Sequence, residues 1–217
     1  EVIETLCDDK KITFKIIDKY DTENGSLGYT MLSCEEHLQD PFIFVSNDTI
    51  VNFNEFEEQL NEFDNWALYY EKLAEDGFLT SQYRTVEVNN GIVTDFNAKG
   101  LKGTNLYTGV CGISDYKKFW KMMKKSKSNI GEVIGLSHLD NIKAIKTNFW
   151  YDTGNLDSLK KAQVKFKSPL RSVLEKENEA IWFLNNKVYK FHVDENFISQ
   201  RVRRYNSFDK KIVPKLN

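Results

Sequence analysis

The fold is decided by two short segments, FIFVSNDT at residues 42–49 and NFWYDTGN at residues 148–155. Each is an apolar, β-prone stretch that runs into one aspartate, Asp48 in the first segment and Asp152 in the second. In an open α/β sheet, ligands bind beyond the carboxyl ends of the strands. Aspartates at such ends are also suitable oxygen ligands for one Mg²⁺ beside a phosphate. The two segments therefore predict an α/β fold with a phosphate and metal site.

The rest of the chain predicts strands that alternate with helices, with one antiparallel hairpin at Asn89-Asn90-Gly91. We therefore expect a mixed, mostly parallel, three-layer Rossmann-like sheet. The unbroken apolar run 42–45 predicts a central strand that is buried on both faces. Expected strands are 12–17, 41–48, 66–70, 83–88, 92–96, 106–113 and 142–151, and expected helices are 26–38, 54–63, 116–125, 132–139 and 155–166.

One further motif lies before the first segment, and another lies between the two segments. Gly25-Ser26-Leu27-Gly28-Tyr29-Thr30 predicts a turn that leads into a helix, and Asn97-Ala98-Lys99-Gly100 follows an expected strand. Over residues 1–165, the four motifs in this order resemble the sugar-nucleotide pyrophosphorylases. Those nucleotidyltransferases join a nucleoside triphosphate to a sugar 1-phosphate.

The resemblance implies a role for each matched position. Asp48 and Asp152 would hold Mg²⁺ and phosphate, and Lys99 would hold the sugar phosphate. The nucleotide would lie near Gly25, Gly28 and Asn47 in this family. Thr108 and Gly109 stand where the family has residues close to the sugar.

The chain departs from the family at two places. Ala98 replaces the glutamate that usually precedes the lysine. The Gly-rich basic loop that binds the triphosphate in this family does not occur, although backbone N–H groups of such a loop are a strong anion site. We therefore expect a nucleotidyltransferase-like domain at 1–167 that lacks its N-terminal part.

Residues 168–217 have a different pattern, which predicts a hairpin followed by a helix. It resembles the small N-terminal lobe of choline and aminoglycoside kinase-like phosphotransferases, in which a strand lysine holds nucleotide phosphates. Lys190 matches that lysine. The pattern stops before anything like a kinase catalytic loop, so we expect only the start of a kinase-like module.

Composition excludes several classes of protein. With 41% hydrophobic and 13% aromatic residues, the chain is expected to fold. No apolar run approaches the ~20 residues of a membrane helix, and three scattered cysteines suit the reducing cytoplasm. Residues 1–157 carry 16 Lys and Arg against 26 Asp and Glu, whereas 158–217 carry 14 against 6. The basic residues are not interleaved with stacking aromatics, so no nucleic-acid partner is expected.

The sequence thus predicts a cytoplasmic nucleotidyltransferase that makes precursors of surface polysaccharides and releases pyrophosphate. A non-catalytic or regulatory domain of a bifunctional phosphotransferase is an open alternative, as is a phosphotransferase that depends on Lys190. A metal-dependent glycosyltransferase would usually carry Asp-x-Asp, but Ser46 stands two residues before Asp48. The sequence leaves open the base, the phosphate acceptor and the oligomeric state, a homo-oligomer included.

Overall fold

The structure is a computed structural model in which the chain divides into two compact units, Glu1–Leu159 and Lys160–Asn217. Helix α5, Leu156–Lys165, runs across this boundary. The residues that the structure describes are 12–17, 26–60, 64–72, 82–101, 103–126, 131–166, 178–184, 187–209 and 211.

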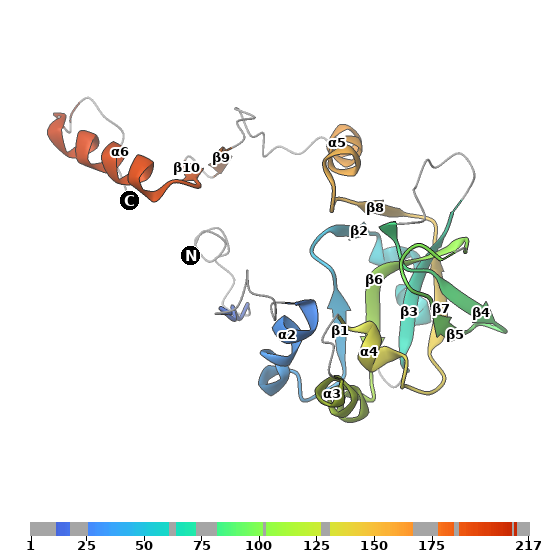
Figure 1. Cartoon of the computed structure of the whole chain (residues 1–217). Coiled ribbons are helices and arrows are strands. Elements are labelled where there is room, and N and C mark those ends of the chain that lie inside the picture. The colour runs from blue at the N-terminus through green and yellow to red at the C-terminus, as the bar shows by residue number, and fades with distance from the viewer. Residues whose placement is uncertain are drawn as a thin grey trace. The chain divides into compact units, whose positions relative to one another are not determined.

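A six-stranded sheet with the order β1-β6-β3-β7-β5-β4 is the centre of the first unit (Figure 1). A separate two-stranded sheet joins β2 to β8. The strands are β1 Phe42–Val45, β2 Thr49–Val51, β3 Trp66–Glu71, β4 Val86–Asn89, β5 Ile92–Phe96, β6 Asn105–Ile113, β7 Lys143–Thr147 and β8 Trp150–Asp152.

The sheet is mixed, which confirms the predicted α/β class. Only β3 and β7 are parallel neighbours, whereas the other described pairs in this sheet are antiparallel. The pairings place β1, β3, β4 and β7 in one direction and β5 and β6 in the other. Most strands therefore share a direction, but neighbours mostly do not. The reason is that β6 inserts between β1 and β3, and that β4 and β5 are joined by a tight turn, with Asn90 at φ 50° and Gly91 at φ 76°.

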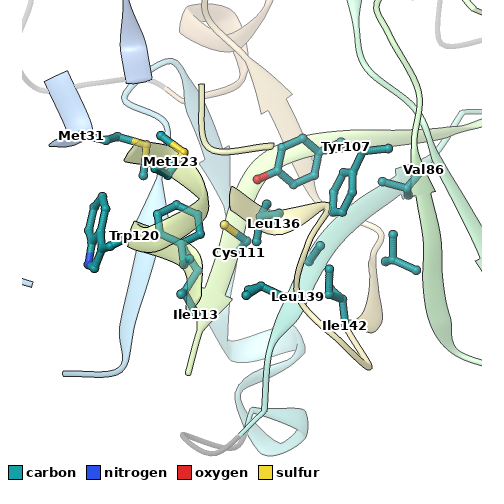
Figure 2. Packing of buried hydrophobic residues seen from close by; sticks show 14 residues of the cluster. Met31, Val86, Tyr107, Cys111, Ile113, Trp120, Met123, Leu136, Leu139 and Ile142 are labelled. Atoms are coloured by element: carbon teal, nitrogen blue, oxygen red, sulfur yellow. The ribbon is translucent and has the colours of Figure 1, made fainter. Parts of the chain in front are cut away.

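Apolar residues pack on both faces of the sheet, because alternate strand residues point to opposite faces. Along β3, Trp66 and Leu68 belong to one buried cluster and Ala67 to the other. Helices cover the face with Ala67, and Figure 2 shows Met31, Trp120, Met123 and Leu136 from these helices packed over strand residues such as Cys111 and Ile113. Phe56, between two short 3-10 helices, packs on the other face.

Two helices of this unit, α2 and α3, begin directly after a residue whose side chain caps them. Ser26 Oγ accepts a hydrogen bond from Tyr29 N at 3.2 Å, and Asp115 Oδ1 accepts one from Lys118 N at 3.2 Å. Several helices are shorter than predicted, since the spacing of apolar residues shows which face of a helix is buried but does not define where the helix ends. The described helices of this unit are α2 Leu27–Leu32, η1 Glu35–His37, η2 Phe53–Glu55, η3 Glu57–Gln59, α3 Tyr116–Lys125 and α4 Val133–Leu136.

Two predicted strands were wrong in position. Residues 12–17 form no strand, and Ile16 is 79% exposed, because no described strand pairs with this segment. β1 was predicted to be central, but among the described strands it pairs only with β6 and lies at the edge of the sheet. Ile43 is consequently 50% exposed. An apolar run alone cannot distinguish a central strand from an edge strand.

Two more predictions had the wrong length or type. The expected helix at 54–63 is a pair of 3-10 turns as far as residue 60, and residues 61–63 lie outside the described part. The expected strand 142–151 divides into β7 and β8. β8 leaves the main sheet and pairs with β2, with Thr49 opposite Asp152 (Figure 1). This division carries Asp152 to the segment that holds Asp48.

The second unit contains an antiparallel hairpin of β9, Glu179–Leu184, and β10, Lys187–His192, as the sequence predicted. Its two turn residues, 185 and 186, lie outside the described residues. Helix α6, Glu195–Ser207, follows and begins at Asp194, whose Oδ1 accepts a hydrogen bond from Asn196 N at 2.8 Å.

Candidate functional site

Asp48 and Asp152 lie side by side at one end of the β2–β8 pair. The backbone joins them, since Thr153 N donates to Asp48 O at 2.8 Å. A Cβ atom placed on Gly154 would lie 2.9 Å from Asp48 Oδ2 and 3.2 Å from Asp152 Oδ1. Both carboxylates therefore face the same small space, and a side chain at Gly154 would push into it.

A serine and a glycine hold Asp48 in place. Ser46 Oγ donates to Asp48 Oδ1 at 2.5 Å, and Ser46 N donates to Gly109 O at 2.9 Å. Gly109 has φ 77°, and a Cβ there would lie 2.9 Å from Ser46 Cβ. Glycine is thus needed at 109 for its backbone conformation and for its close approach to Ser46. The contact fixes the turn that carries Asp48.

Three donors hold Asp152. Tyr83 Oη and Asn155 Nδ2 donate to its Oδ2 at 2.8 and 2.9 Å, and Gly154 N donates to its Oδ1 at 3.1 Å. Asn155 also caps α5, because its Oδ1 accepts a hydrogen bond from Ser158 N at 3.0 Å. Burial, and then the hydrogen bond to the Asp152 carboxylate, raise the pKa of the Tyr83 phenol, so the phenol keeps its proton and remains a donor.

The carboxylate pair opens onto a cavity of about 810 Å³. Arg84 and Lys99 bring positive charge to the cavity, whereas Asp95 and Glu132 add carboxylates to those of Asp48 and Asp152. The aromatic part of the lining consists of Tyr83, Phe96, Tyr107 and Trp150. A volume of this size is in the range that small-molecule sites in proteins occupy.

Five of the nine predicted site residues line this cavity, namely Asp48, Lys99, Thr108, Gly109 and Asp152. The Thr108 hydroxyl is buried and donates to Leu68 O at 3.0 Å, so its proton is engaged in a hydrogen bond within the sheet. Among the others, Gly28 is buried in α2, and neither it nor Asn47 belongs to the lining, whereas Gly25 lies outside the described residues.

Lys190, the last of the nine, lies in the second unit. Its amino group forms an ion pair with the buried carboxylate of Glu179 at 2.6 Å. Lys190 Nζ also lies 5.3 Å from the centre of the Phe197 ring. Its contacts among the described residues are thus within the hairpin and helix of its own unit.

Sequence reasoning missed Tyr83, Arg84 and Glu132 as parts of the cavity. Tyr83 and Arg84 fall within a predicted strand, and Glu132 begins a predicted helix. They meet because Tyr107 N, in β6, donates to Arg84 O at 2.9 Å and because α4 packs near the same strand. Nothing in their local spacing predicts this meeting, which arises from tertiary pairing.

The chemistry of the pair suits Mg²⁺. Mg²⁺ in proteins is usually held by one or two carboxylates, and phosphate oxygens and waters complete its coordination. Among the residues that the structure describes, no group of three or more His, Cys, Asp or Glu is placed to hold a metal ion. A metal at this site would therefore depend on ligand oxygens besides Asp48 and Asp152.

Comparisons with known proteins identify the fold. No family model matches the chain, and no curated protein matches it either. Among solved structures, a glucose-1-phosphate thymidylyltransferase from Bacillus anthracis matches at TM-score 0.55 and 17% identity, over 70% of this chain and 64% of that one. The inositol-1-phosphate CTP transferase from T. maritima matches at TM-score 0.53 and 15% identity, over 67% and 64%.

A UTP-bound UGPase from Acinetobacter baumannii matches at TM-score 0.52 and 14% identity, over 66% of this chain and 57% of that one. The chain thus spans less than two thirds of the length of these three structures. It has their nucleotidyltransferase fold, as the sequence predicted. None of the three is a kinase, and the kinase-like module at 168–217 stays a prediction. In the described part of the chain, no helix has the length and apolarity that crossing a membrane requires.

Proposed function

We propose that this chain carries the site of a nucleotidyltransferase that joins a nucleoside triphosphate to a sugar 1-phosphate or a similar small phosphate. The observation that carries the proposal is the convergence of Asp48 and Asp152 on one point beside Gly154, at the wall of a cavity that also contains Arg84 and Lys99. Carboxylates for a metal and cations for phosphates are the groups that phosphoryl chemistry needs.

In the proposed reaction, a phosphate oxygen of the acceptor attacks the α-phosphorus of the triphosphate. A new P–O bond forms as the bond from the α-phosphorus to the bridging oxygen breaks, and pyrophosphate leaves with that electron pair. Mg²⁺ held by Asp48 and Asp152 would neutralise charge on the phosphates. The product would be an activated sugar for polysaccharide assembly, made in the cytoplasm where nucleoside triphosphates are available.

The side chains contribute position and charge. Lys99 and Arg84 attract the acceptor phosphate, while Ser46 and Tyr83 fix the orientation of the two carboxylates by hydrogen bonds. Fixing the ligands in advance removes part of the entropic barrier to transfer. Phe96, Tyr107 and Trp150 add apolar surface to the wall of the cavity beside these charges.

Calorimetric binding tests the proposal. The full chain is titrated with CTP, UTP, dTTP, GTP and ATP, with and without Mg²⁺, beside the Asp48→Asn variant. We expect Mg²⁺-dependent binding of one nucleotide, and a loss of at least about tenfold in affinity in the variant, because one of the two carboxylates that hold the metal is neutralised. Equal binding with and without Mg²⁺, or by both proteins, would contradict the assignment. It would favour a domain that is not catalytic.

A further inference from the structure

The bend that separates β7 from β8 is held by a carboxylate from another part of the chain, Glu55. Its Oε2 atom accepts hydrogen bonds from Thr147 Oγ1 at 2.9 Å and from Asn148 N at 3.2 Å. Thr147 Oγ1 in turn accepts a hydrogen bond from Phe149 N at 3.1 Å. Asn148 and Phe149 form the bend, since they lie between the end of β7 and the start of β8. Glu55 therefore fixes the backbone at the point where the chain leaves the main sheet.

The direction of this bend decides where Asp152 lies. β8 pairs with β2 rather than with the main sheet, and Thr49 lies opposite Asp152 in that pair. Two further hydrogen bonds join the strands, from Trp150 Nε1 to Thr49 Oγ1 at 2.7 Å and from Thr153 N to Asp48 O at 2.8 Å. Each strand is only three residues long. An isolated two-stranded pair is marginally stable at best, so its position depends on support from outside the pair.

Glu55 can give this support because it stands on a buried base. It lies in η2, which follows β2 in the chain. The next residue, Phe56, is 1% exposed and belongs to the same buried cluster as Ile145 of β7. One short stretch of chain therefore leads from Asp48 through β2 to Glu55, and Glu55 is bonded to the bend that precedes Asp152. The two metal-binding segments of the proposed site are thus connected through Glu55.

We propose that Glu55 is a positioning residue for the transfer reaction, which sets the separation of the Asp48 and Asp152 carboxylates by accepting the hydrogen bonds at the bend. The inference rests on the proposed function. Glu55 is not among the described residues that line the cavity, so it acts on the carboxylates through the backbone rather than by contact. Groups that orient metal ligands without touching the metal typically change metal affinity by about 10- to 100-fold.

Position 55 requires an acceptor oxygen and not a negative charge. Both donors are neutral, and a glutamine side chain also presents an acceptor oxygen with two lone pairs. Loss of the acceptor should affect the bend more than the fold. The Thr147 hydroxyl has Phe149 O at 3.1 Å as an alternative acceptor, and Asn148 is exposed, so water can accept from its N–H. Neither replacement ties the bend to η2.

Amide hydrogen exchange, followed residue by residue by NMR on the full chain, tests the inference without any reaction. The variants are Glu55→Ala, Glu55→Gln and Glu58→Ala, which removes an exposed carboxylate of η3 and so makes the same change in charge. In Glu55→Ala, the amides of Asn148 and Thr153 should exchange at least about tenfold faster, the value of about one hydrogen bond. The amides of β3 should be unchanged. Glu55→Gln and Glu58→Ala should exchange like the unaltered chain.

Turnover measured against Mg²⁺ concentration is the second readout. Glu55→Ala should raise the Mg²⁺ concentration for half-maximal rate by about tenfold, and Glu55→Gln by less than about threefold. Faster exchange throughout the main sheet in Glu55→Ala would mean that Glu55 only supports the fold, which would overturn the inference. An unchanged Thr153 amide would overturn it too, as would a Glu55→Gln variant that is as impaired as Glu55→Ala.

Failure here is distinguishable from failure of the proposed function. If the Thr153 amide exchanges faster in Glu55→Ala but the unaltered chain shows no Mg²⁺-dependent turnover, the control of the bend by Glu55 stands and the transfer reaction does not. If the unaltered chain turns over with Mg²⁺ and Glu55→Ala matches it in Mg²⁺ dependence and in exchange, the reaction stands and the positioning role does not.

Discussion

The cavity and the β9–β10 hairpin differ in how their carboxylates are matched. In the hairpin, Glu179 has a side chain that is 4% exposed, and Lys190 lies 2.6 Å from it. At the cavity, Asp48 and Asp152 receive hydrogen bonds from neutral groups, and neither forms an ion pair with a described residue. An ion pair stabilises the fold, whereas two carboxylates that converge without a paired cation can bind one. The comparison therefore supports the proposal that the chemistry lies in the first unit.

The largest expected effect is on turnover. Asp152→Asn should lower the rate of pyrophosphate release by about 100-fold or more, because electrostatic stabilisation of the transferring phosphate usually contributes most to catalysis of this kind. Asp140→Asn is the matched control, since its carboxylate is 83% exposed in a surface ion pair with Lys118. Near-normal turnover in Asp152→Asn would remove the carboxylate pair from the mechanism.

A glycine substitution tests the convergence itself. Gly154→Ala keeps both carboxylates but places a methyl group 2.9 Å from Asp48 Oδ2. We expect a rate loss of about 100-fold, because displacements near 1 Å in a preorganised site have effects of that size. Steady-state kinetics against Mg²⁺ concentration measures it. An unchanged Mg²⁺ requirement would show that the two carboxylates do not share a metal.

The next effect concerns the stability of the hairpin. Lys190→Met removes an ion-pair partner of a buried carboxylate, which should destabilise the hairpin by about 1–3 kcal/mol, discounted because Lys190 is one-third exposed. Amide hydrogen exchange of β9 and β10 measures this local opening. Adding Glu179→Gln should restore part of the protection. Intact protection together with lost ATP binding in Lys190→Met would instead support the kinase-like prediction and break the comparison.

The sequence was sufficient for the elements whose signals are local. The turn at Asn90-Gly91 and the helix at 116–125 were both predicted, because turn chemistry and a 3.6-residue period depend only on near neighbours. The order of the strands in the sheet was harder to predict. β6 lies between β1 and β3, and no local pattern specifies which strands will be neighbours.

The residues of the site also divide into those that the local sequence predicts and those that it does not. Asp48 and Asp152 were predicted because each ends an apolar strand, a pattern visible within eight residues. Glu132 and Tyr83 were not predicted, because nothing in the sequence around them distinguishes them from other polar residues. Tertiary contacts bury Glu132 and place Tyr83 against Asp152. Residues that support or complete a site thus depend on the whole fold.

A smaller effect on turnover is expected at Tyr83. Tyr83→Phe removes one neutral donor from Asp152, whose other donors are Asn155 and Gly154. The rate should fall by about threefold to tenfold, the value of one hydrogen bond, and the Mg²⁺ concentration for half-maximal rate should rise. A variant that loses rate with no change in Mg²⁺ dependence would mean that Tyr83 does not act through Asp152.

The smallest effect is the pH dependence of stability at Glu132. Burial raises the pKa of this carboxyl, so the folded chain favours its protonated form. Its contribution to stability is complete below the ordinary carboxyl pKa and is lost as pH rises through the higher folded value. Glu132→Gln should therefore stabilise the chain by about 1 kcal/mol at pH 7, and the difference should shrink towards pH 4. Urea unfolding at both pH values measures it. A variant that gains no stability at pH 7 would show that burial of the Glu132 carboxylate does not destabilise the folded chain.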